Sequence, residues 1–252
     1  MKMINALVWL RFKTLMKNTS VIVIALLPFT MLLLYKNFVF KDMGVEGTLL
    51  AVSSCLSMSF CVTTMNILTS TIAEEKEKNN LKSLILSGVS NLEYILSSIV
   101  IPLIMGIVCI LIFPIIANAD FGDHYYKYIF AGFITLIIHI FLGIVLAMFS
   151  ETQMKAQMAV MPVMFITTLL PMLSSHDEQI RKICSFSYIG VYNDFFSSMS
   201  AGESVNFSMQ DISILVSWSI VLFALNIFLY KKTKKGGFSL RIKTFKKEEV
   251  SI

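Results

Sequence analysis

Six long runs without a charged residue constrain this sequence more than any other feature. They cover residues 18–35, 48–73, 94–117, 128–149, 156–174 and 212–230. Each is close to the roughly 20 residues that cross a bilayer as an α-helix. The alternating pattern of a membrane β-barrel is absent, whereas a helix satisfies its backbone polar groups within one segment. We therefore expect an all-α integral membrane protein with six transmembrane helices, and a long buried helix is the alternative interpretation of the last two runs.

Composition agrees with a membrane protein, and the basic residues predict its orientation. Of 252 residues, 56% are apolar and 15% are charged, whereas about a quarter of a soluble domain is charged. With the amino terminus inside, 16 of the 21 Lys and Arg residues fall in inner segments and 5 in outer loops. Basic residues near helix ends resist translocation. We expect both termini in the cytoplasm, the basic tail 231–252 against anionic lipid, and no nucleic-acid partner.

Residues 1–17 precede the first run and have an amphipathic pattern. On a helical wheel the apolar residues share one arc and the lysines another: Ile4, Leu7, Val8, Phe12 and Leu15 against Lys2, Lys13 and Lys17. Such a helix lies in the membrane interface, so we expect an interfacial helix at the inner face. Arg11 falls within the apolar arc, and its long stem would carry the charge to the headgroups. The alternative is a charged leader before the first span.

Motifs of nucleotide-binding and metal-dependent enzymes are absent. The sequence has no GxxxxGK[ST] loop, no GxGxxG turn and no HExxH pair. We therefore expect no catalytic residue, no metal site and no cofactor bound by this chain, so ATP and Mg²⁺ would bind to another subunit. The six runs contain no Asp, Glu, Lys or Arg, and His139 is the exception among charge-bearing residues. It is either a proton or substrate contact or an imidazole hydrogen-bonded between helices.

The inner segment 74–93 combines acidic, apolar and helix-breaking residues. Three acids come first, three apolar residues follow, and a break precedes a new helix: Glu74, Glu75 and Glu77, then Leu81, Leu84 and Ile85, then residues 87–90 before Glu93. This order predicts a helix, a turn and a second helix. Apolar side chains on a solvated loop require a covering surface, so we expect a docking partner. Folding back on the bilayer surface is the alternative.

Taken together, these features resemble the membrane subunit of an ABC-2 type ATP-driven exporter. The shared features are the interfacial helix, six spans, two inner termini and a first inner loop that commonly reads E-x-E-x-G-T-L-x-x-L-L-x-x-P-x-S. The residues that fit this pattern in register are Glu75, Glu77, Leu81, Leu84, Ile85 and Ser90. Asn79 and Asn80 replace the Gly-Thr pair, and Gly88 replaces the proline. The motif match is therefore partial, while the likeness in organisation covers the whole chain.

The resemblance implies roles for two groups of residues. The segment 74–93 would form a coupling helix that docks on the ATPase, through Glu75, Glu77, Leu81, Leu84, Ile85, Val89 and Ser90. Spans 48–73 and 156–174 would line the substrate path, through Ser57, Thr64, Met161, Met164 and Phe165, with Leu169 and Leu170 as an apolar gate. Ordinary packing between helices is the alternative for this second group.

The resemblance also implies a fold, an assembly and a function. Residues 1–252 would form one membrane domain of the type V exporter kind, with short re-entrant helices in the outer region 175–211. Two permease subunits, identical or different, would pair with two ATPases in a bacterial cytoplasmic membrane and export a hydrophobic or amphipathic substrate. Small bacterial members include exporters of amphipathic peptides, such as the phenol-soluble modulin exporter, so a peptide is expected. The alternatives are a secondary transporter or channel, and a scaffold that anchors an ATPase.

Overall fold

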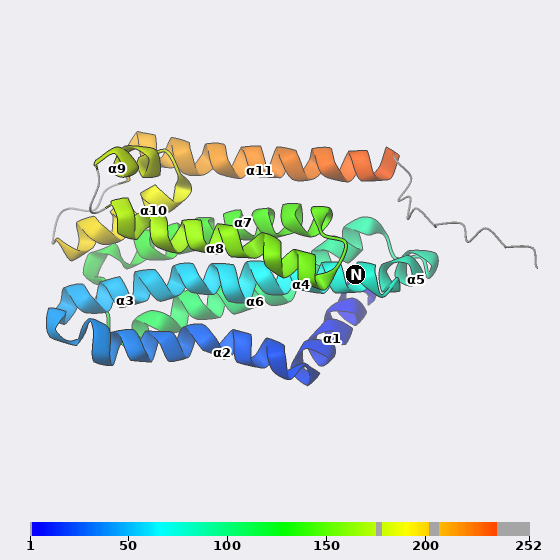
Figure 1. The fold of residues 1–252 in the computed structure, drawn as a ribbon, viewed down its shortest axis with the longest axis horizontal. Helices are drawn as coiled ribbons and strands as arrows, with labels where there is room; N and C mark the ends of the chain where they lie inside the picture. The colour runs from blue at the N-terminus through cyan, green and yellow to red at the C-terminus, as the bar shows by residue number, and fades with distance from the viewer. Residues whose placement is uncertain (1, 175–177, 202–206, 236–252) are drawn as a thin grey trace, which may run out of the picture.

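The computed structural model describes residues 2–174, 178–201 and 207–235, and this part of the chain contains helices and no strand (Figure 1). The α-helices are α1 (Lys2–Lys17), α2 (Thr19–Leu34), α3 (Gly44–Ser59), α4 (Asn66–Glu77), α5 (Asn80–Leu86), α6 (Asn91–Ala117), α7 (Tyr125–Phe149), α8 (Gln153–Ser174), α9 (Glu178–Ser185), α10 (Tyr188–Ser200) and α11 (Met209–Lys235). Two π-helical turns, η1 (Tyr35–Val39) and η3 (Phe60–Met65), and two 3₁₀ turns, η2 (Lys41–Met43) and η4 (Gly122–His124), extend or connect them. The expected all-α class is confirmed.

Five helical stretches are long and apolar enough to cross a membrane. They are Thr19–Val39, Lys41–Glu77, Asn91–Ala117, Gly122–Phe149 and Met209–Lys231. Each contains most or all of one predicted run. The remaining run, 156–174, lies in α8, a 22-residue helix that is not among these five. The count of six spans therefore stays a prediction, and residues 236–252 of the basic tail lie outside the described part.

The helices form an elongated bundle with a well-packed centre. Helices α2 and α11 lie on opposite edges (Figure 1), and in each only 11% of the most apolar stretch is buried. The central helices α3, α6 and α7 supply most of the core, with side chains such as Leu56, Phe113 and Leu136 fully buried. A Cβ placed on Gly106 of α6 would lie 2.3 Å from Leu136 Cδ1 of α7. Glycine therefore allows these two helices to approach closely.

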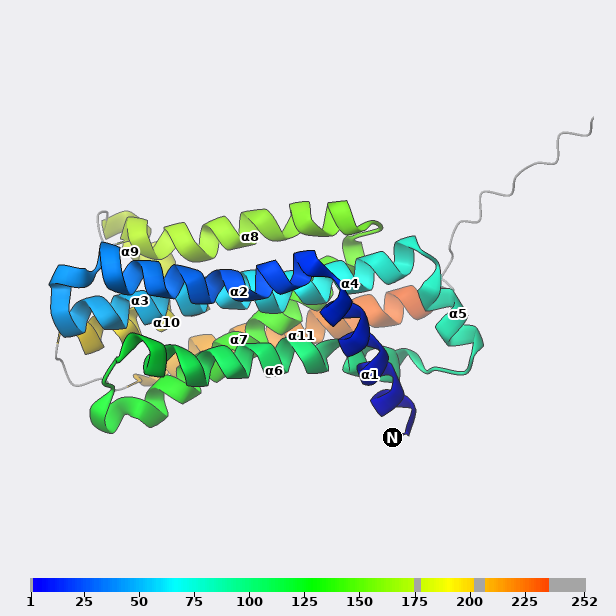
Figure 2. The same ribbon diagram turned by 90° about the horizontal axis from the view of Figure 1, so that it is seen from below.

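The described part of the outer region 175–211 packs on the bundle. Helices α9 and α10 lie at the end opposite α1 and α5 (Figures 1 and 2). Tyr192 of α10 is buried, and its hydroxyl donates to the carbonyl of Ser53 in α3 at 3.1 Å. Phe195 and Phe196 are also buried against the core. Tyr192, Phe195 and Phe196 are therefore covered by protein, whereas Ile183 and Phe186 are exposed. The re-entrant position of this region in a membrane stays a prediction.

Candidate functional site

Four helices meet at the end of the bundle that carries the amino terminus. Helix α1 packs mainly against α6, and α4 leads through α5 into the start of α6 (Figures 1 and 2). Both figures show α5 projecting beyond the long helices. We call residues 74–77, the last turn of α4, the α4 terminal turn.

The segment between α4 and α6 has the predicted helix, turn, helix form. Helix α5 ends at Leu86, and Gly88 has a φ of 89°, which glycine adopts without steric cost. Ser90 then caps α6: its hydroxyl accepts from the Glu93 N–H at 3.2 Å, and the Glu93 carboxylate accepts from the Ser90 N–H at 3.0 Å. This reciprocal capping box fixes where α6 begins.

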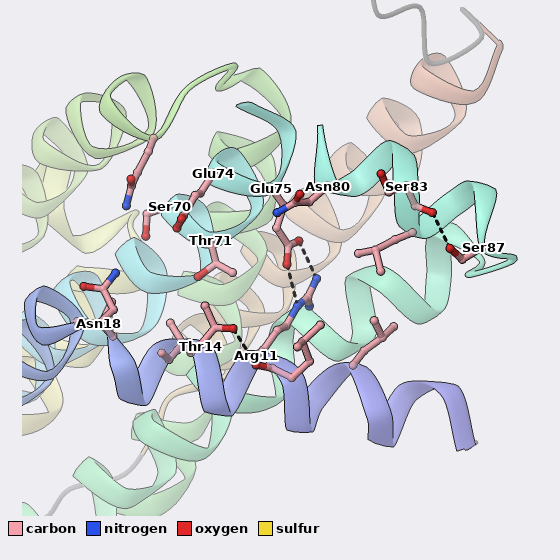
Figure 3. A pocket seen from close by; sticks show the side chains of 16 residues that line it. Arg11, Thr14, Asn18, Ser70, Thr71, Glu74, Glu75, Asn80, Ser83 and Ser87 are labelled. Carbon is pink, nitrogen blue, oxygen red and sulfur yellow. Dashed lines mark hydrogen bonds and ion pairs between the residues drawn. The ribbon is translucent and has the colours of Figure 1, made fainter. Parts of the chain in front are cut away.

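Glu75 in the α4 terminal turn forms an ion pair with Arg11 of α1. Arg11 Nη2 lies 2.9 Å from Glu75 Oε2, and Nε lies 3.3 Å from Oε1, so the pair is bidentate (Figure 3). The exposed fractions of the two side chains are 5% and 17%. The Tyr94 hydroxyl of α6 donates to the same carboxylate. Glu75 therefore joins α1, α4 and α6.

Arg11 makes further contacts that correct the sequence-based expectation. Its Nη1 donates to the Tyr94 carbonyl at 3.2 Å, to Ser97 Oγ at 3.0 Å and to Ser98 Oγ. The guanidinium carbon also lies 4.7 Å from the centre of the Tyr94 ring. The expectation that Arg11 reaches the headgroups is therefore wrong, because a carboxylate and several oxygen atoms inside the protein satisfy its charge.

Two further charged residues of the turn, Lys76 and Glu77, contact α7 and α8. Lys76 Nζ donates to the carbonyls of Ala147 at 2.5 Å and Met148 at 3.3 Å, in the last turn of α7. These carbonyls have no partner within the helix, and a cation is favourable at a helix carboxyl end. Glu77 Oε2 accepts the backbone N–H of Gln153, the first residue of α8, at 2.9 Å. One helical turn therefore contacts α1, α6, α7 and α8.

One match to a known family decides what kind of protein this is. A sequence model of the ABC-2 family transporter proteins matches residues 12–228, which is most of the chain. The chain belongs to the ABC-2 transporter family. No curated protein matches it. Family membership implies a multi-pass membrane protein with an ABC ATPase partner, consistent with a non-catalytic permease subunit.

In this ABC-2 protein the predicted coupling residues do not all share one surface. Glu75 and Glu77 point to other helices of the chain, and Val89 is 6% exposed. Leu84 is partly buried against the bundle core, so this chain already covers part of the expected apolar face. The side chains of Leu81 and Ile85 lie outside the described part. Ser90 acts as the helix cap.

The sequence analysis did not assign a role to three residues at this end of the bundle. Lys76 was counted only for orientation, and Tyr94 was taken as the start of a span. Leu86, at the end of α5, is 79% exposed and was not among the apolar residues singled out in this segment. A signal existed for Arg11, since a charge within an apolar arc indicates a buried partner. No comparable signal marks Lys76, because a lysine near a helix end is common.

The predicted path residues of the ABC-2 protein are divided between the interior and one outer face. Thr64, in η3, is fully buried, and Ser57 is half-buried. Met161 and Phe165 of α8 are 55% and 54% exposed. Met164 and Leu170 are half-buried, and the side chain of Leu169 lies outside the described part. Within one chain, Thr64 and the α8 residues therefore do not face a common space.

Proposed function

We propose that this ABC-2 protein is the permease subunit of an exporter powered by a separate ATPase. The complete transporter contains two ATPases and a second permease subunit, identical or different. Its substrate is hydrophobic or amphipathic, with an amphipathic peptide as the class that fits best. The observation that supports this proposal most is the α4 terminal turn, because a transporter powered from outside the membrane needs a mechanical connection to its spans.

The proposed connection begins at α5. This helix projects from the bundle (Figures 1 and 2). Leu86 at its end is 79% exposed, and Leu92 in the first turn of α6 is 61% exposed, so both offer apolar contacts to a partner. Only Lys78 and Asn79 separate α5 from α4. A displacement of α5 by the ATPase therefore reaches the α4 terminal turn directly. From there Glu75 transmits it to α1 and α6, Lys76 to α7 and Glu77 to α8, in each case through a hydrogen bond of the charged side chain.

The proposed substrate path uses the outer face of α8. Met154, Met158, Met161 and Phe165 lie at helical spacing and are each more than half exposed. The opposite face of α8 packs on the bundle through buried Ala156, Val160 and Thr167. Methionine side chains are flexible and polarisable, so they accommodate varied apolar partners. A second permease subunit facing this stripe would enclose a path suited to an amphipathic peptide.

A proton-coupled secondary transporter is the alternative, and His139 is the observation that favours it. The imidazole is 1% exposed, and its Nδ1 donates to the Thr135 carbonyl of the same helix at 2.8 Å. The expected hydrogen bond between helices is therefore absent at this nitrogen. Nε2 has no partner among the described residues. A proton-coupled transporter would need this histidine, whereas an ATP-powered one would not.

The test separates docking from folding. Leu86→Asp places a charge on the exposed end of α5, so we expect the copurifying ATPase to be lost while the protein still inserts. Ile183→Asp is the matched control, because Ile183 is 68% exposed on α9 at the other end of the bundle. His139→Gln should leave ATPase binding and transport in place. If Leu86→Asp retains wild-type ATPase binding and His139→Gln abolishes transport, the secondary transporter becomes the better assignment.

A further inference from the structure

A cavity of about 380 Å³ lies between α1 and the α4–α5 segment. Figure 3 shows that it opens beside the ion pair of Arg11 and Glu75. Its volume is within the range of about 300–1,000 Å³ that is typical of small-molecule sites. We call it the α1–α4 pocket. The side formed by α1 and α2 contains the apolar residues Leu10, Leu15 and Val21 together with polar ones, and the α4 and α5 side contains mainly hydroxyl, amide and acidic groups together with Leu84.

Three of the five hydroxyl groups that line the pocket have their proton engaged within the protein. Thr14 and Ser70 donate to a carbonyl of their own helix at 2.9 and 3.2 Å, and Ser87, just after α5, donates to the Ser83 carbonyl at 2.8 Å. Their oxygen lone pairs are left for a ligand. These three hydroxyl groups therefore favour a ligand that carries hydrogen-bond donors.

The charged side chains of the pocket differ in whether a partner within the protein already engages them. Arg11 is the one basic side chain among the described lining residues, and Glu75, Tyr94 and two serines occupy all of its nitrogen atoms. The Glu75 carboxylate accepts hydrogen bonds from both Arg11 and Tyr94. Glu74 is different: its described ion pair is with Lys78, whose side chain is 61% exposed and does not line the pocket.

Glu74 is therefore the acid that a ligand can engage. Its hydrogen bond to Lys78 raises the pKa of that lysine, yet exposed pairs of this kind are weak and exchange readily with competing cations. A ligand cation inside the pocket would meet Glu74 together with the lone pairs of Ser70, which lies one turn earlier on the same helix and which Lys78 does not contact. The pocket thus combines one available negative charge, several acceptors and an apolar wall.

We propose that the α1–α4 pocket binds an amphiphile with a primary ammonium headgroup. The ammonium N–H groups donate to Glu74 and to the Ser70 hydroxyl oxygen, and the apolar chain lies along Leu10, Leu15 and Val21. Two sources have this chemistry: the ethanolamine headgroup of a membrane lipid, and an amine-bearing amphiphile from solution. The proposal does not depend on the ATPase assignment, and its test uses the permease chain alone.

The first experiment measures binding to the purified full chain in phosphatidylcholine nanodiscs. Dodecylammonium should bind, dodecyltrimethylammonium should bind more weakly because it has no N–H donor, and dodecyl sulfate should not compete. Glu74→Gln should weaken dodecylammonium binding about tenfold, since a hydrogen bond to a charged partner is lost. Glu151→Gln is the matched control, because Glu151 forms the same kind of exposed pair with Lys155 away from the pocket. Equal affinity of the Glu74→Gln and wild-type proteins would overturn the proposal.

A second variant tests the pocket independently of Glu74. Thr14→Phe places a large ring at the pocket wall from an exposed position, so the fold should survive while dodecylammonium binding is lost. Unchanged binding in Thr14→Phe would place the ligand elsewhere and refute the site. The source is then identified by repeating the titration in nanodiscs that contain phosphatidylethanolamine. Weaker apparent binding there assigns the pocket to the lipid, and equal binding assigns it to an amphiphile from solution.

Discussion

At the scale of single residues, Arg11 shows how a charge can be buried at a helix junction. Desolvating a guanidinium and a carboxylate costs several kcal/mol for each ion. Here the bidentate contact with Glu75 and the oxygen atoms of Tyr94, Ser97 and Ser98 offset that cost. Such a pair gives little net stability against an apolar replacement. It does fix the register of three helices, because no other position supplies the same set of acceptors.

Removal of one partner of this pair should be more harmful than removal of both. Arg11→Met leaves Glu75 buried without its cation, so we expect a loss of about 3–5 kcal/mol in the free energy of unfolding. The double variant Arg11→Met with Glu75→Gln should recover part of that loss. Thermal unfolding of the purified proteins in one detergent measures both effects. Lys155→Met, which breaks the exposed pair with Glu151, serves as control and should not shift the melting temperature. An unchanged melting temperature for Arg11→Met as well would contradict a buried ion pair.

At the scale of helices, the sequence predicted positions well and ends less well. The run 94–117 predicted α6, which starts earlier, at Asn91, because the Ser90 and Glu93 capping box extends the helix into polar residues. The run 48–73 stops at the first acid, whereas α4 continues to Glu77. A charged turn is therefore helical where its side chains have partners on neighbouring helices. The positions of the apolar runs in the sequence do not indicate which residues those partners are.

The contacts between helices were the part that sequence could not supply. Arg11 and Glu75 are 64 positions apart, and Lys76 meets Ala147 at a separation of 71. With one sequence, nothing indicates which acid an arginine will meet across such distances. The helix, turn and helix of segment 74–93, with its turn around Gly88, were predictable because they depend on local backbone preferences. The division of Thr64 and Met161 between interior and surface depends on helix rotation, which a charge-free run leaves undetermined.

The junction of α9 and α10 gives a prediction about helix packing. A Cβ on Gly190 would lie 2.0 Å from the Cys184 carbonyl oxygen, a backbone atom that cannot move aside alone. Gly190→Ala should therefore separate α10 from α9 and destabilise the protein by about 1–3 kcal/mol. Gly132→Ala is the control, since its nearest neighbour would be Ile110 at an ordinary 3.4 Å. Equal melting temperatures for the two variants would show that the close approach at Gly190 does not occur.

At the scale of the whole molecule, the two ends of the bundle differ in character. One end carries α9 and α10, and the other carries α1, α5 and the α4 terminal turn (Figure 1). The distribution of Lys and Arg predicts that the second end faces the cytoplasm. The four native cysteines are buried, so we expect them to react little with a thiol reagent in labelling experiments.

Orientation can therefore be tested with two single cysteines. Phe186→Cys lies near α9 at a position that is 69% exposed, and Leu86→Cys lies on α5 at one that is 79% exposed. In intact cells a membrane-impermeant maleimide should label Phe186→Cys and leave Leu86→Cys unmodified, and cell lysis should make Leu86→Cys reactive. The reverse pattern would invert the topology. Labelling of both from outside would remove one of the predicted spans.

The continuous helix formed by α3, η3 and α4 has a mechanical consequence. It runs from Gly44 to Glu77, which at 1.5 Å per residue is about 50 Å and well beyond the roughly 30 Å of hydrocarbon in a bilayer. In the predicted topology, such a rod is a lever whose two ends lie on opposite sides of the membrane. A tilt of one degree displaces one tip by about 1 Å relative to the other over this length. A few degrees applied at the Glu77 arm would therefore shift the Gly44 arm by a distance comparable to the width of an atom.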